Sequence, residues 1–239
     1  MALTASRRVP ADPGLSWLDQ LAAPDARAVL WDCCRSARWV ERMEALRPYR
    51  TRGRLVDLAD AVTRRLEWTE VRQALASFPR LGDAGHEGGH RESWTHGDSW
   101  ARLNTQNRLV IQSRQEIWAR QEQEAFAASG FEEEPLARAV ALGAREYEER
   151  FGYVFVICGQ GRTAHQTLAA LSTRLNNEPR TERLVVRAEL AAIARIRLVK
   201  LLASPAVRAT VTARTAGTAR TTMTAAGSAA VKVPAQLPA

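Results

Sequence analysis

The sequence predicts an all-α protein, a single compact helical domain of about eight helices with a disordered C-terminal tail. Three observations lead to this fold class. Apolar residues recur at steps of three and four along most of the chain up to residue 202, which is the spacing of one helix face. Capping residues and prolines stand where these stretches begin and end. Residues 203–239 are mostly Ala, Thr, Gly and Pro with no core-forming pattern, a composition typical of disorder.

The first part of the chain predicts a flexible N-terminus at residues 1–13 and then five helices. These helices are expected around residues 15–21, 24–33, 37–47, 55–66 and 70–78. Ser36 and Thr69 are placed to cap the third and fifth of them, because a side-chain oxygen there accepts from a free backbone N–H. Pro48 and Pro79 are placed to end the same two helices.

Helical periodicity disappears between Gly82 and about Ile117, where Gly, His, Ser, Asn and Trp accumulate. We therefore predict a long loop or insertion at residues 84–117, since loops of this length in a compact domain are usually functional or disordered. Helices return at residues 118–128, 134–151, 163–175 and 179–202, so that the folded domain is expected to span residues 14–202.

A short apolar segment, Tyr153 to Cys158, separates two of these helices. Gly152 is placed to end the preceding helix, because it adopts positive φ without strain. The segment is too short for a helix and rich in β-branched and aromatic residues, so it is expected to cross the interior in extended form. Its backbone N–H and C=O groups then need partners. It is either the wall of a ligand site or a core segment paired by neighbouring backbone.

The distribution of charge argues against a nucleic-acid partner. The net charge is +8, yet residues 203–239 alone contribute four basic residues and no acid. No stripe of arginine interleaved with aromatic residues occurs, and no recognition motif is present.

No apolar run is long enough to span a membrane, and the N-terminus lacks a signal-peptide core, which predicts a cytoplasmic protein. The three cysteines lack metal-ligand spacing and are expected to be reduced.

Few residues stand out as chemical groups. His86, His90 and His96 lie together in the polar loop, where no third metal ligand is signalled and a solvated loop is favoured. Glu122 begins a helix that could aim a carboxylate into a pocket or lie on a solvated face. Arg197 lies on the apolar stripe of the last helix, where an unpaired charge costs several kcal/mol. Its partner is either a structural glutamate or a substrate carboxylate.

Taken in order, six motifs resemble those of 2-oxo-4-hydroxy-4-carboxy-5-ureidoimidazoline (OHCU) decarboxylases, over about residues 14–202. The motifs are Leu30-Trp-Asp-Cys-Cys-Arg-Ser-Ala-Arg-Trp39 with Met43, Ala76-Ser-Phe-Pro-Arg-Leu-Gly-Asp83, Trp118-Ala-Arg-Gln-Glu-Gln123, Tyr147-Glu-Glu-Arg-Phe-Gly152 with Phe155 to Gly161, Arg174-Leu-Asn176 and Ile193-Ala-Arg-Ile-Arg-Leu198.

The resemblance implies an all-α homodimer that converts OHCU to (S)-allantoin in urate breakdown, with no metal and no organic cofactor. By that resemblance Glu122 orients the acid–base group or the substrate, and Arg197 binds an anionic group. Pro79 and Arg80 correspond to the last two residues of the family motif Ala-His-Pro-Arg and are therefore expected to bind the substrate. The backbone that holds the substrate ring corresponds to Val154, Phe155, Val156, Ile157 and Cys158.

The sequence departs from the family at the position of the catalytic histidine, which is Phe78. Phenylalanine neither donates nor accepts a proton, and Ala119 and Ala144 replace two further polar positions. Two explanations compete. A loop histidine (His86, His90 or His96) takes over proton transfer, or the pocket has lost decarboxylation. The alternative function is therefore a catalytically inactive relative that binds a ureide, a purine-derived ligand or a protein partner.

Overall fold

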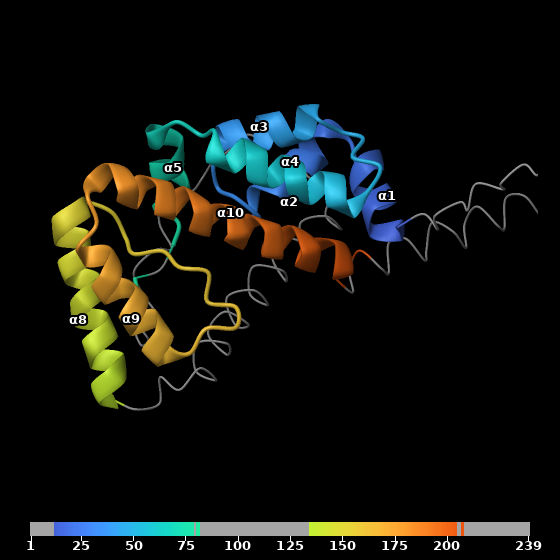
Figure 1. Ribbon diagram of the computed structural model, residues 1–239. Helices are drawn as coiled ribbons and strands as arrows, with labels where there is room; N and C mark the ends of the chain where they lie inside the picture. The colour runs from blue at the N-terminus through green and yellow to red at the C-terminus, as the bar shows by residue number, and fades with distance from the viewer. Residues whose placement is uncertain (1–11, 79, 82–133, 205–206, 208–239) are drawn as a thin grey trace, which may run out of the picture.

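The structure is a computed structural model that describes residues 12–78, 80–81, 134–204 and 207. Over these ranges it contains eight α-helices and no β-strand, which confirms the all-α prediction (Figure 1). The helices are α1 (Pro13–Gln20), α2 (Ala23–Trp31), α3 (Ala37–Ala45), α4 (Arg52–Arg64), α5 (Trp68–Leu75), α8 (Glu134–Phe151), α9 (Ala164–Leu175) and α10 (Pro179–Ala203).

Helix α10 is the longest of the described helices and connects two packing units. Figure 1 shows α1 to α5 gathered along α10, while α8 and α9 lie together near its N-terminal end. Helix α4 packs extensively on α10, and α8 packs on α9. The main hydrophobic cluster joins α1 to α5 with buried residues of α10 such as Leu190 and Leu198. Burial of this apolar surface is the chief stabilising contribution to the fold.

The segment between α8 and α9 lies at the boundary of two hydrophobic clusters. Phe155 packs with Tyr147 of α8 and Leu171 of α9 in the smaller cluster. The next residue, Val156, belongs instead to the main cluster around α10. Successive side chains of an extended segment point to opposite sides, and this pair follows that rule. The segment therefore joins the α8–α9 pair to the rest of the molecule.

The predicted helix ends at Ser36 and Gly152 are confirmed. The Ser36 side chain accepts the Trp39 N–H at 3.3 Å, and Gly152, directly after α8, has a φ of 76°. The Thr69 prediction was wrong, because α5 begins two residues earlier than expected, at Trp68. There the N-cap is Glu67, whose N–H donates to the Glu70 carboxylate at 2.8 Å. This return contact from the third helical residue fixes the start of the helix.

Helix α1 also starts earlier than the apolar pattern suggested. Its first residue is Pro13, because Asp12 accepts the N–H groups of Gly14 and Leu15 at 3.0 and 3.1 Å. The expected loop at 84–117 and the helix at 118–128 lie outside the described residues. Among the residues that the structure describes, no helix combines the length and the apolar character needed to cross a bilayer.

Replacement of Gly14 by alanine is expected to destabilise the protein. A Cβ atom at Gly14 would lie 2.4 Å from the carbonyl oxygen of Leu202, so the ends of α1 and α10 would have to separate. We expect Gly14→Ala to lower the free energy of unfolding by about 1–3 kcal/mol in denaturant titrations. Gly53 is the matched control, because it is also the second residue of its helix and a Cβ atom added there would meet no atom within 4 Å. Equal losses for Gly14→Ala and Gly53→Ala would contradict the close approach.

Candidate active site

A buried ion pair lies where α9, α10 and the Tyr153–Cys158 segment meet. Arg174 ends the buried stripe of α9, and Glu182 lies in the first turn of α10. The two side chains are 6% and 0% exposed. Arg174 donates to Glu182 Oε1 through Nε at 2.8 Å and through Nη2 at 2.6 Å. Because a buried charge without its partner is costly, each residue stabilises the other in this position.

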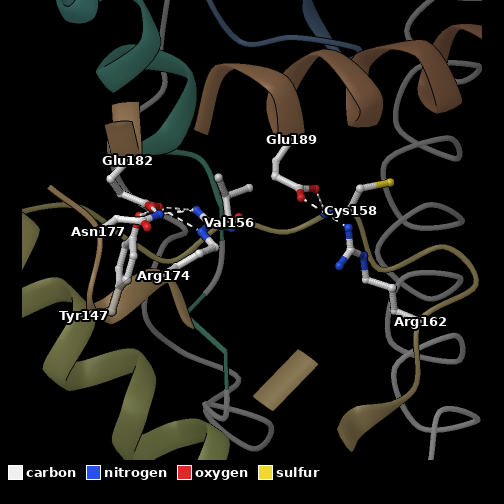
Figure 2. A network of polar contacts seen from close by, with 8 residues as sticks. All are labelled: Tyr147, Val156, Cys158, Arg162, Arg174, Asn177, Glu182 and Glu189. Atoms are coloured by element: carbon white, nitrogen blue, oxygen red, sulfur yellow. Dashed lines mark hydrogen bonds and ion pairs between the residues drawn. The ribbon is translucent and has the colours of Figure 1, made fainter. Parts of the chain in front are cut away.

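Neighbouring side chains complete the hydrogen bonding of this pair. The Tyr147 hydroxyl donates to the same Glu182 oxygen, and Asn177 Nδ2 donates to Oε2 at 2.7 Å (Figure 2). Burial, together with the hydrogen bond to Glu182, raises the pKa of Tyr147, which keeps the hydroxyl protonated as a donor. The Arg174 guanidinium also stacks 4.5 Å from the ring centre of Phe155.

Two charged side chains bind the backbone of the central segment. Arg174 Nη1 donates to the Val156 carbonyl at 2.7 Å, and the Cys158 N–H donates to Glu189 Oε2, also at 2.7 Å. Glu189 comes from α10, two turns after Glu182. The prediction that this backbone needs partners is confirmed for these two groups. Their partners are side chains of α9 and α10 rather than neighbouring backbone.

Two positions that the resemblance assigned to the site lie in contact. Phe78 follows α5, and its half-buried ring lies under the Arg197 guanidinium, whose central carbon is 5.0 Å from the ring centre. This cation–π contact contributes about 0.5–2 kcal/mol. A buried Arg–Glu pair of the kind considered for Arg197 is found at Arg174, and Arg197 stacks on an aromatic ring.

Arg197 also lies within electrostatic reach of the Cys34 thiol. Burial raises the pKa of Cys34 to about 12, although the nearby Arg197 charge and a backbone hydrogen bond at Ser36 act in the opposite direction. A thiol with this pKa stays protonated at neutral pH. Cys34 is almost fully buried and packs within the main hydrophobic cluster.

The other predicted site residues fall into two groups. Arg80 is largely exposed and pairs with Glu148 of α8 through Nε at 2.9 Å. Five predicted residues lie outside the described part of the chain: Pro79, Glu122, His86, His90 and His96. Over the described ranges, no group of three or more His, Cys, Asp or Glu side chains is arranged to hold a metal ion.

Sequence reasoning missed the roles of Arg174, Glu182 and Glu189. A signal for Arg174 was present, because the buried positions of α9 recur at Ala164, Thr167, Leu171 and Arg174. An arginine on such a stripe requires an anionic partner. Its partner belongs to the next helix, so the sequence spacing alone did not indicate Glu182.

The described part of the chain is thus an all-helical protein whose interior contains a paired arginine and glutamate beside a nonhelical apolar segment. The family model for OHCU decarboxylase matches residues 19–199. The chain therefore belongs to the OHCU decarboxylase family.

Two characterised relatives match a shorter stretch. One is the 2-oxo-4-hydroxy-4-carboxy-5-ureidoimidazoline decarboxylase of Amia calva, 39% identical over 61 residues, which is 26% of this chain and 35% of the relative. The other is the uric acid degradation bifunctional protein TTL of Arabidopsis thaliana, 37% identical over 60 residues, which is 25% of this chain and 18% of the relative. The matched stretches thus span about a third or less of either relative.

Two solved structures were also found by structural comparison. An OHCU decarboxylase in the presence of (S)-allantoin superposes with a TM-score of 0.48 and 20% identity, covering 73% of this chain and 96% of that one. An (S)-allantoin synthase superposes with a TM-score of 0.47 and 17% identity, covering 78% and 53% of the two chains.

Removal of one member of the buried pair should be far more damaging than removal of both. Arg174→Met leaves Glu182 buried without its cation, so we expect a loss of about 3–5 kcal/mol in the free energy of unfolding. The double variant Arg174→Met/Glu182→Met should lose clearly less than the sum of the two single variants, measured by denaturant titration. Arg64→Met, which breaks an exposed ion pair with Asp60, is the control and should cost under about 1 kcal/mol. Additive losses in the double variant would show that the two groups are not coupled.

Proposed function

We propose that this chain decarboxylates OHCU to (S)-allantoin, a step of urate breakdown. The match of the family model over residues 19–199 is the observation that carries this proposal. The name of the Amia calva relative supports the same substrate and reaction. We further propose that the chain acts in the cytoplasm as a homodimer, with residues 14–202 as its folded unit.

The proposed reaction breaks the bond between the substrate carboxylate and a ring carbon. Carbon dioxide leaves, and the electron pair of the broken bond stays on the ring carbon, from which it is delocalised into the imidazolone ring. This ring carbon then takes up one proton. The enzyme has to hold the carboxylate away from water and deliver the proton to one face. Fixed donors near the ring stabilise the charge that develops on it.

We assign binding of the anionic group to Arg197 and binding of the ring to the backbone of residues 154–158. Phe78, Val154 and Cys158 all pack against the main hydrophobic cluster that includes α10, so both proposed binding elements border the same core. The stack on Phe78 orients the Arg197 guanidinium and covers one of its faces. Its N–H groups lie in the guanidinium plane, where a carboxylate binds to two of them at once.

Proton transfer is the step for which Phe78 is unsuited. The residue offers a ring face to Arg197 and has no ionisable group. In our proposal the proton comes from a loop histidine, His86, His90 or His96, all of which lie outside the described residues. Loss of a general acid typically lowers a rate by about 10²–10⁴-fold, so a slow enzyme is the expected form of this function.

A second candidate function is ligand binding without catalysis. The observation that favours it is the Arg197–Phe78 stack, which keeps an anion-binding group in place where the family's histidine is absent. A site built around this stack would bind a ureide, a purine-derived ligand or a protein partner. Assays of turnover distinguish this candidate from a slow decarboxylase.

Restoration of the histidine is expected to accelerate the reaction. We expect Phe78→His to raise the rate of (S)-allantoin formation by about 10²-fold or more, because it supplies the missing acid–base group. The rate is followed by circular dichroism with freshly generated OHCU. A native chain as fast as the variant would show that another residue already transfers the proton without loss of rate. If neither protein exceeds the spontaneous reaction or shows stereospecificity, the proposed function is wrong.

Arg197 is expected to be needed for substrate binding. Arg197→Met should lower kcat/KM by roughly 10- to 100-fold, the equivalent of one charge-assisted hydrogen bond. Arg195→Met is the matched control, since Arg195 lies two residues away on the same helix and is exposed. The two variants are compared in the same allantoin assay at several substrate concentrations. Similar kinetics for both would remove Arg197 from the proposed site.

A further inference from the structure

Two consecutive peptide groups of the central segment are held by charged side chains from different helices. Arg174 of α9 binds the carbonyl of Val156, and Glu189 of α10 binds the N–H of Cys158 (Figure 2). Ile157 lies between these two contacts. Its N–H belongs to the first of the two peptide groups and its C=O to the second.

The planarity of the peptide bond converts these contacts into a fixed orientation of Ile157. Within the described residues the only cis peptide bond is Arg47–Pro48, so the two peptide groups around Ile157 are trans. In a trans peptide group the N–H and the C=O point in opposite directions. The Ile157 N–H therefore points away from Arg174, and the Ile157 C=O points away from Glu189.

These two groups of Ile157 are available for a ligand. In the part of the chain that the structure describes, neither the N–H nor the C=O of Ile157 makes a hydrogen bond. The residue is half-buried and packs against the smaller hydrophobic cluster. A backbone donor and acceptor beside apolar side chains lack partners unless water or a ligand supplies them.

We propose that Glu189 is a positioning residue, which fixes the peptide group between Ile157 and Cys158 so that the Ile157 backbone meets a ring carrying an N–H beside a C=O. This inference rests on the proposed function, in which residues 154–158 bind the imidazolone ring. Glu189 acts through the segment and does not itself touch the substrate. Arg174 holds the preceding peptide group in the same way, but its buried pair with Glu182 also supports the fold.

The second oxygen of Glu189 has a different partner. Glu189 Oε1 lies 3.3 Å from Arg162 Nη2, and the Arg162 side chain is 40% exposed. An ion pair of this exposure contributes little, typically under about 1 kcal/mol. The hydrogen bond to Cys158, rather than the charge of Glu189, is thus the contact that matters. Variants that remove the hydrogen bond to Cys158 are therefore expected to lose more activity than a variant that removes only the ion pair with Arg162.

The test compares Glu189→Ala, Glu189→Gln and Arg162→Ala in the full chain. Glu189→Ala removes the acceptor for the Cys158 N–H and should lower kcat/KM for allantoin formation by roughly 10- to 100-fold. Glu189→Gln keeps a carbonyl acceptor and should retain most of the activity. Arg162→Ala removes only the ion pair and should lower kcat/KM by less than about fivefold. Hydrogen–deuterium exchange of residues 153–158 is measured for the same proteins.

The exchange measurement separates positioning from loss of structure and from failure of the proposed function. Positioning requires faster exchange in Glu189→Ala that is confined to residues 153–158 and absent from the other two variants. Faster exchange throughout the protein, or a Glu189→Gln variant as impaired as Glu189→Ala, overturns the inference. If the native chain forms no (S)-allantoin, the proposed function fails. The exchange pattern then decides by itself whether Glu189 positions the segment.

Discussion

The ion pair between Arg174 and Glu182 is the interaction on which the described structure depends most. It brings together α9 and α10 directly, α8 through Tyr147, and the central segment through the Val156 carbonyl. Each partner is almost fully removed from water, so neither charge is tolerable without the other. Four parts of the chain therefore meet around one electrostatic contact whose polar groups are hydrogen-bonded to one another.

Helix α10 carries the charged residues that link this contact to the proposed site. Glu182, Glu189 and Arg197 are spaced by seven and eight residues, which places them about 10 and 12 Å apart along the axis and on one broad side of the helix. Glu182 anchors the arginine that holds Val156, Glu189 holds Cys158, and Arg197 lies on Phe78. A single rigid element thus orients the segment and the proposed anion-binding group relative to each other.

Phe78 contributes an aromatic surface, and no ionisable group, to its contact with Arg197. A phenylalanine ring fills much of the space of an imidazole and still presents a face to the Arg197 guanidinium, as it does here. The ring packs against the main hydrophobic cluster and has no group that could transfer a proton. Membership of the family rests on the pattern over residues 19–199 and does not depend on this one side chain.

The sequence by itself determined the helices, their ends at Ser36 and Gly152, and the family, because helix periodicity and capping act over a few neighbouring residues. It also indicated that the central segment needs partners. The predicted N-cap of α5 was Thr69, whereas Glu67 caps the helix. The sequence analysis also considered a buried pair with glutamate for Arg197 and not for Arg174. Only the tertiary structure decided that Arg174 pairs with Glu182 and that Glu189 reaches Cys158. The physical reason is that the partner of a buried charge depends on how whole helices pack together, and the spacing of residues within one helix does not specify that packing.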